Sequence, residues 1–127
     1  MRQVWVVDDD EEMNEAIGLM LEVLGCEVIS FHSARPAAQK LLTGKRPQLL
    51  ILDINMPEIS GLDLLEFLRR RPEGKDLPIL ILSSESADSI MDKALQLGAD
   101  AYVKKPATIE ELEKAMEISL HKHLSTK

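Results

Sequence analysis

Acidic residues at two places in the chain could share one chemical task. Five acids run from Asp8 to Glu12 directly after a short apolar segment, and Asp53 follows a second apolar segment. The run alone allows two interpretations. In the first, one of its acids caps a helix and the others favour the positive end of the helix dipole. The carboxylates of Asp8, Asp9 and Asp53, brought into one crevice, would instead repel one another unless a hard divalent cation lay between them. Mg²⁺ is the expected cation, with Mn²⁺ as an alternative, because an incomplete set of protein oxygens leaves room for water and a phosphate oxygen.

A hydroxyl and an ammonium group follow two later apolar segments. Ser83 ends one of these segments, and Lys104 and Lys105 end the other, just before Pro106. Each is ordinary alone, since serine often caps a helix and lysine is usually solvated. Gathered with the carboxylates, they make up the set of groups that holds a cation and a phosphoryl group. A carboxylate can itself be the nucleophile and form an aspartyl phosphate.

Composition limits the class of protein. The chain has 127 residues, a net charge of −7, 45% apolar residues and 3% aromatic residues, which fits one globular domain. The single cysteine, Cys26, and the lack of a signal-peptide pattern favour a reducing compartment, and we expect the cytoplasm. The apolar runs are too short to cross a membrane. An acidic chain with few aromatic residues is also a poor candidate for direct nucleic-acid binding.

Two alternating periodicities predict the elements that must position these side chains. Runs rich in β-branched residues predict five strands, at Gln3–Val7, Glu27–Phe31, Gln48–Asp53, Ile79–Ser83 and Ala101–Lys104. Helical spacing of apolar residues predicts five helices, at Met13–Leu24, Ala34–Leu42, Gly61–Arg71, Ser86–Leu97 and Thr108–Leu120. Gly25 is expected in a left-handed cap, and Thr108 and Glu111 have the spacing of a capping box.

Five strand–helix units in succession predict a three-layer α/β sandwich with a parallel sheet. Right-handed crossovers return the chain to the same edge and place helices on both faces of the sheet. The expected architecture is a doubly wound, flavodoxin-like (βα)5 fold with strand order 2-1-3-4-5, in which ligands bind outside the carboxyl ends of the strands. The first and third strands are then neighbours, so Asp53 lies beside the acidic run.

Four segments resemble motifs of the receiver domains of two-component response regulators. They are V-V-D-D-D at 6–10, D-I-N-M-P-E-I-S-G at 53–61, L-S-S-E at 82–85 and A-Y-V-K-K-P at 101–106. The resemblance covers nearly the whole chain and implies the CheY-like form of the predicted fold. It predicts a receiver domain at 1–121, with 122–127 as a C-terminal tail or the start of a linker.

The resemblance implies a chemical role for each matching residue. Asp53 would accept a phosphoryl group from the phosphohistidine of a sensor histidine kinase or a histidine phosphotransfer protein. The domain would be a signalling domain that catalyses only its own phosphorylation and dephosphorylation. Lys105 would pair with the phosphate, and Ser83 would close its hydroxyl onto a phosphate oxygen. The implied metal ligands are Asp8, Asp9, Asp53 and the backbone carbonyl of Asn55.

Other implied roles concern switching and rate. Tyr102 would turn inward when Ser83 moves, and Asn55 and Glu85 would tune the rate at which the aspartyl phosphate hydrolyses. The Lys105–Pro106 peptide bond would be cis.

The implied output surface is built from the fourth predicted helix, the fifth strand and the fifth helix. It would contact an output domain, a partner or a second copy of the chain. The sequence leaves open whether the chain is a stand-alone regulator or a piece of a longer protein.

Three alternatives remain beside this interpretation. A phosphatase of the haloacid dehalogenase type would share the Asp8-x-Asp10 spacing but expects Thr or Val where this chain has Glu12. A flavin-binding protein of the same topology would have a phosphate loop where the five acids lie, and these acids would repel the phosphate. A receiver-like module would have the same fold and would bind partners without being phosphorylated.

Overall fold

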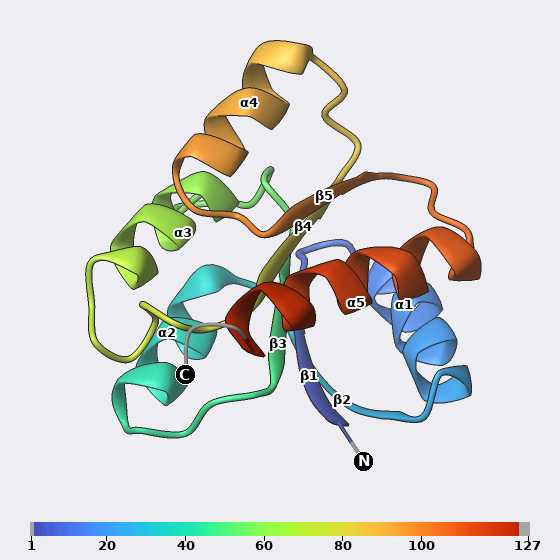
Figure 1. Ribbon diagram of the computed structural model, residues 1–127, viewed down its shortest axis with the longest axis horizontal. Coiled ribbons are helices and arrows are strands. Elements are labelled where there is room, and N and C mark those ends of the chain that lie inside the picture. The colour runs from blue at the N-terminus through green and yellow to red at the C-terminus, as the bar shows by residue number, and fades with distance from the viewer. Residues whose placement is uncertain (1, 125–127) are drawn as a thin grey trace.

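The structure is a computed structural model that describes residues 2–124. Its strands are β1 (Arg2–Val7), β2 (Cys26–Phe31), β3 (Leu49–Leu52), β4 (Ile79–Ser83) and β5 (Ala101–Lys104). Its helices are α1 (Glu11–Val23), α2 (Ala34–Leu42), α3 (Gly61–Arg69), α4 (Asp88–Gln96) and α5 (Ile109–Leu124). The strands form one parallel sheet in the order β2-β1-β3-β4-β5, which confirms the predicted doubly wound topology (Figure 1).

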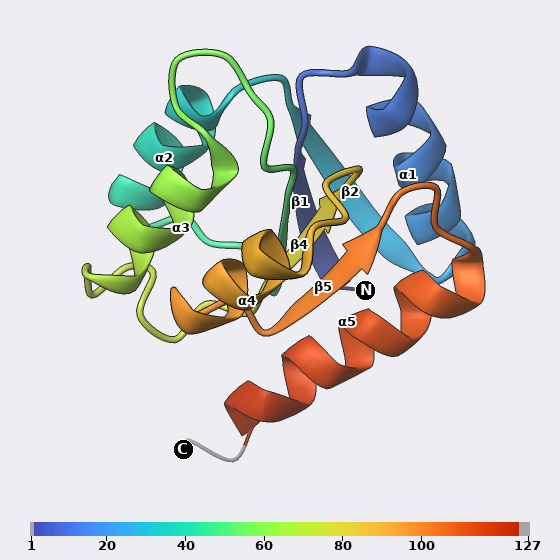
Figure 2. The same cartoon turned by 90° about the horizontal axis from the view of Figure 1, so that it is seen from above.

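The sheet is covered on both faces, so the molecule has three layers (Figure 2). One buried cluster joins the sheet to α2, α3 and α4, and a second joins it to α1 and α5. Every residue of β3 and β4 is buried. Strands enclosed on both faces have no polar side, which explains why these two segments are almost uninterrupted apolar runs. No helix within residues 2–124 is long and apolar enough to span a membrane.

Local signals in the sequence set two helix ends as predicted. Gly25 adopts a φ of 85° just after α1, a conformation that glycine reaches without the steric cost of a Cβ. At the start of α5 the Thr108 Oγ1 accepts from the Glu111 N–H at 3.1 Å, and a Glu111 carboxylate oxygen accepts from the Thr108 N–H at 2.9 Å. This reciprocal pair is a capping box.

Several helix ends differ from the predicted bounds, and α1 begins at Glu11 rather than Met13. α3 stops at Arg69 rather than Arg71, because a following proline disfavours helical backbone in Arg71. α4 begins at Asp88 rather than Ser86, and residues 84–87 form a loop.

α5 continues to Leu124 instead of stopping at Leu120. Its last turn is held by Lys122, whose Nζ donates to the Asp100 carbonyl at 2.8 Å, and by His123. The predicted domain boundary at residue 121 stays a prediction, and residues 125–127 of the predicted tail lie outside the described residues.

Candidate functional site

Three carboxylates meet where β1 and β3 end. β1 runs into Asp8 and Asp9, and β3 runs into Asp53, on strands that pair side by side. One oxygen from each of the three carboxylates lies within 4.8 Å of the others. Asp8 and Asp53 are buried, whereas Asp9 is exposed. The predicted convergence of these acids is therefore present, and the topology of the sheet produces it.

The acidic run divides between the two interpretations left open by the sequence. Asp10 is the N-cap of α1, and its side chain accepts from the Met13 N–H at 3.1 Å. Glu11 and Glu12 occupy the first turn of the helix, where negative charge favours the helix dipole. The acids that precede Asp10 face the crevice instead, so capping and convergence both occur.

Lys105 brings a positive charge into the carboxylate cluster. Its Nζ lies 2.5 Å from Asp8 Oδ2 and 3.6 Å from Asp53 Oδ2, and its side chain is 10% exposed. Lys104 is exposed at the end of β5. Side-chain alternation along a strand allows only one of the two lysines to face the crevice, and the resemblance implies that it is Lys105. The Lys105–Pro106 peptide bond is cis, the form that the resemblance implies.

Glycine at position 61 allows α3 to begin directly against the phosphoacceptor candidate. A Cβ on Gly61 would lie 2.0 Å from the backbone oxygen of Asp53, far inside contact distance. The Gly61 N–H donates to the Ile54 carbonyl at 2.9 Å, and the Ser60 Oγ caps the helix by accepting from the Asp63 N–H at 3.1 Å. The loop between β3 and α3 is therefore fixed at both ends.

Burial and a like charge act together on Asp53. Burial raises the pKa of its carboxyl, and the neighbouring Asp8 raises it further, while Lys105, the Ser83 hydroxyl and the Ile54 N–H lower it. The net direction is upward. In the absence of a cation, Lys105 thus compensates only part of the cost of holding two buried carboxylates together.

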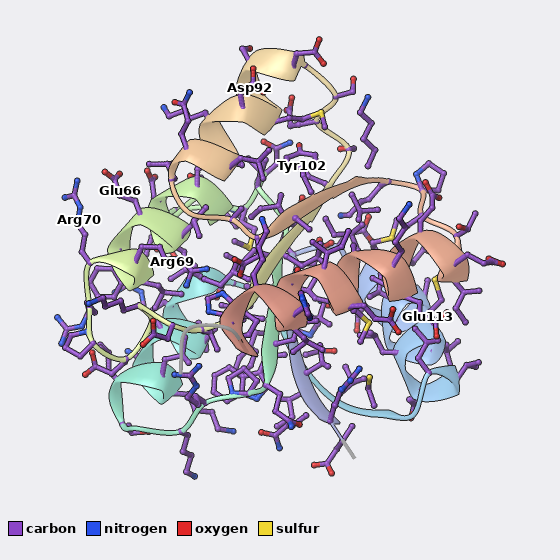
Figure 3. The ribbon with its side chains drawn as sticks, viewed as in Figure 1. Glu66, Arg69, Arg70, Asp92, Tyr102 and Glu113 are labelled. Atoms are coloured by element: carbon purple, nitrogen blue, oxygen red, sulfur yellow. The ribbon has the colours of Figure 1, made fainter. Side chains whose placement is uncertain are left out.

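A second group of predicted residues surrounds the loop between β4 and α4. The Ser83 Oγ accepts from the Glu85 N–H at 3.3 Å, and a Glu85 carboxylate oxygen accepts from the Asn55 side-chain amide at 3.0 Å. The Tyr102 hydroxyl donates to the Glu85 carbonyl at 2.7 Å, and Figure 3 shows this tyrosine between α4 and β5. Burial raises the pKa of the Tyr102 hydroxyl. One loop therefore contacts the aspartate loop on one side and the aromatic residue of β5 on the other.

Asn14 is a site residue that the sequence analysis missed. It is 3% exposed, and its Nδ2 donates to the Asp8 carbonyl at 2.5 Å and to the Phe31 carbonyl at 3.4 Å. These bonds join the end of β1 to the end of β2 from the first turns of α1. The sequence contained a signal for a buried polar residue here. Asn14 lies three and seven residues before Ile17 and Leu21, which places it on the buried face of the helix.

The donor set suits a hard divalent cation. The cluster of Asp8, Asp9 and Asp53 offers only carboxylate oxygens, the ligand type that Mg²⁺ prefers. Among residues 2–124 it is the one group of three or more acidic, histidine or cysteine side chains close enough to hold a metal. The exposure of Asp9 leaves the cluster open toward solvent on one side.

The chain matches known proteins over most of its length. The profile of the response regulator receiver domain matches residues 4–117. Response regulator MprA of Mycobacterium ulcerans is 35% identical over 120 residues, which make up 94% of this chain and 50% of that protein. The chain thus spans about half the length of the relatives that it matches in sequence.

Solved structures show the same architecture. A CheY chemotaxis protein from Vibrio cholerae superposes with a TM-score of 0.83 at 28% identity, over 92% of this chain and 97% of that one. The receiver domain of a sensor histidine kinase from Pseudomonas aeruginosa superposes with a TM-score of 0.85 at 22% identity, over 94% of this chain and 98% of that one. That protein holds a magnesium ion in its active-site cleft. From the profile match and the sequence relatives, the chain belongs to the response regulator receiver domain family and is a domain of two-component signalling.

Proposed function

We propose that Asp53 accepts a phosphoryl group from a phosphohistidine of a sensor histidine kinase or a histidine phosphotransfer protein. A carboxylate oxygen of Asp53 attacks phosphorus, the bond between phosphorus and the imidazole nitrogen breaks, and the imidazole leaves with that electron pair. The product is an aspartyl phosphate. The observation that carries the proposal is the position of Lys105 Nζ, 3.6 Å from an Asp53 oxygen within a group of three carboxylates.

The residues around Asp53 supply what this transfer needs. The carboxylate must be ionised to attack, and Lys105 favours that form against the burial that raises the pKa of Asp53. The incoming phosphoryl oxygens carry negative charge, so the same ammonium would move from the carboxylates onto the phosphate. Ser83 is fully buried at the end of β4, and its hydroxyl would donate to a phosphate oxygen.

We propose that the cation is Mg²⁺, with Mn²⁺ as an alternative, held by Asp8, Asp9 and Asp53 and by the backbone carbonyl of Asn55. The oxygen-only cluster supports this, as does the magnesium ion of the Pseudomonas aeruginosa receiver domain. When bound, the cation would spread the negative charge of the phosphoryl group in the transition state. We propose that the site residues catalyse the phosphorylation and dephosphorylation of their own domain and no other reaction.

The contacts of the β4–α4 loop suggest how the phosphate could reach the surface. Ser83 accepts a bond from Glu85, and Glu85 accepts one from Tyr102. If Ser83 turned to the phosphate, the first bond would break and the loop would shift, which would free Tyr102 to turn inward. We propose that this alters the face formed by α4, β5 and α5, through which an output domain or a second copy would be controlled. The same loop places Asn55 and Glu85 beside the site, where they would tune hydrolysis.

Cys26 is the single cysteine of the chain and is buried, which is consistent with a reducing compartment. We propose that the phosphoryl transfer takes place in the cytoplasm. The length of the matched relatives, about twice that of this chain, supports an attached output domain.

The test is chemical phosphorylation followed by intact-mass measurement. Incubation with acetyl phosphate and Mg²⁺ should add one phosphoryl group, about 80 Da, by attack of the Asp53 carboxylate. Asp53→Asn should show no addition, and chelation of the metal should suppress it in the unaltered protein.

The matched control is Asp63→Asn, which removes an acid of α3 that lies outside the cluster. It should be phosphorylated like the unaltered protein. Full addition in Asp53→Asn would contradict the assignment of the acceptor, and full addition without metal would contradict the role of the cation.

A further inference from the structure

A pocket of about 350 Å³ lies on the face of the sheet that α2 covers, separate from the acidic cluster. Its walls are Gln3 and Trp5 of β1, Ile29 of β2, Lys40 of α2, and the loop residues Lys45 and Arg46. None of these residues belongs to the Asp53 site. The volume is near the lower end of the ~300–1,000 Å³ range of small-ligand sites.

Three positive charges converge on this pocket although the whole chain is acidic, with a net charge of −7. Lys40, Lys45 and Arg46 take part in none of the ion pairs among the described residues. Arg46 donates to a backbone carbonyl, that of Asp76, at 3.1 Å, rather than to a carboxylate. Ammonium and guanidinium groups around one small volume attract an anion. Anions of the phosphate class suit both groups, because their oxygens can accept hydrogen bonds from each.

The aromatic wall adds an observation that does not depend on charge. Trp5 is 1% exposed, and its Nε1 has no hydrogen-bond partner in the structure. Lys40 lies over the same indole, with its Nζ 5.7 Å from the ring centroid. A buried N–H without an acceptor is uncommon in folded proteins. This N–H is closed off from solvent, so Trp5 contributes to the pocket through its ring, which lies against Lys40.

We propose that this pocket binds a small, multiply charged anion of the phosphate class. Lys40, Lys45 and Arg46 supply the charge, and the ring of Trp5 forms part of the wall. The pocket shares no lining residue with the Asp53 site, so an anion could bind there whether or not Asp53 is phosphorylated. Binding of an anion in this pocket would make the domain respond to the concentration of that anion in solution.

Trp5 is the one tryptophan of the chain, so its fluorescence reports on this pocket directly. Inorganic pyrophosphate is the probe, titrated in the presence of a chelator so that the acidic cluster, without a cation, repels it. We expect a saturable change with a Kd of about 1 mM or lower that weakens as salt is added. An absent or non-saturable change would overturn the proposal.

Two variants and a control separate this site from general attraction. Lys40→Met keeps the chain length and the contact with Trp5, and Lys45→Gln alters an exposed loop residue. Each should raise the Kd by roughly fivefold or more, the loss expected for a charge-assisted contact. Lys93→Met removes an exposed lysine from α4, which does not line the pocket, and should leave the Kd unchanged. Equal weakening in Lys93→Met, or an unchanged Kd in both pocket variants, would contradict a defined site.

Discussion

Two buried aspartates lie at opposite edges of the same sheet, and their surroundings differ in kind. Asp53 follows β3 at the carboxyl edge, next to a second buried carboxylate, that of Asp8. Asp100 precedes β5 at the amino edge, where its Oδ2 accepts from Arg69 Nη2 at 3.2 Å and from the Ile79 N–H at 2.8 Å, and lies 2.8 Å from His123 Nε2. Asp53 has a like charge beside it in addition to Lys105, whereas Asp100 is contacted by an arginine, a backbone N–H and a histidine.

We infer that the difference separates a structural carboxylate from the one that we propose to react. The Asp100 carboxylate has its partners within the protein, and these contacts join α3, β4, β5 and α5 at the amino edge. The Asp53 cluster carries more negative charge than Lys105 compensates, and we propose that a bound divalent cation would offset the remainder. On this proposal, the contacts of Asp100 stabilise one edge of the sheet, and the other edge carries the reactive group.

Neighbouring arginines at the end of α3 show how selective the amino-edge cluster is. Arg69 points toward the body of the protein, whereas Arg70 points away from it beside Glu66 (Figure 3). Arg69 also donates to the carbonyls of Gly98 and Leu77, at 2.9 and 2.6 Å. Burial lowers the pKa of this guanidinium, and Asp100 opposes that shift.

The largest predicted effect is the loss of Arg69. Arg69→Met would leave Asp100 with one cationic partner fewer and several buried carbonyls without a donor, so the free energy of unfolding should fall by about 3–5 kcal/mol. Chemical denaturation followed by circular dichroism measures it.

Arg70→Met is the control for that measurement. Its ion pair with Glu66 is exposed, and its loss should cost no more than about 0.5 kcal/mol. Similar losses in the two variants would contradict the account of the amino edge.

The next effect is stabilisation by the cation at the carboxyl edge. At a free Mg²⁺ concentration of 100 times the Kd, the domain should gain about 2.7 kcal/mol, because the ion binds the folded state alone. Thermal melts with Mg²⁺ and with a chelator measure the gain. Asp9→Asn removes an exposed acid of the cluster and should reduce it, whereas Asp92→Asn on α4 should not. A gain that is the same in all three proteins would argue against binding at the cluster.

The smallest effect concerns the pH dependence of stability without metal. The pKa of Asp53 is raised in the folded protein, so the folded state binds this proton more tightly than the unfolded chain does. The resulting stabilisation is complete below the ordinary value of 3.8 and is lost as pH rises through the raised pKa. Asp53→Asn should therefore become more stable than the unaltered protein as pH increases. Denaturation at several pH values in chelator checks this, and a constant difference would contradict a raised pKa.

The sequence was sufficient to predict the carboxyl edge because parallel strands bring their ends together. The strands β1, β3 and β5 are followed by Asp8, Asp53 and Lys105, and β4 ends in Ser83. The strand order then determines which of these residues are neighbours. Periodicity also predicted the three layers.

The amino edge could not be predicted in this way. The run of arginines at 69–71 was uniform in sequence, and the turn of Arg69 into the interior depends on Asp100, which lies 31 residues away. The basic pocket likewise joins β1 to the end of α2 and the following loop. Contacts between side chains that do not follow strand ends leave no periodic signal.

The most direct test of the central claim is to locate the phosphoryl group. After phosphorylation in Mg²⁺, borohydride reduces an aspartyl phosphate to homoserine and releases phosphate, and peptide mass spectrometry then identifies the altered residue. We predict homoserine at position 53 alone, with Asp8, Asp9 and Asp100 unchanged. Homoserine at any of those three positions, or none at 53, would contradict the account of Asp53 as the reactive acid of the sheet.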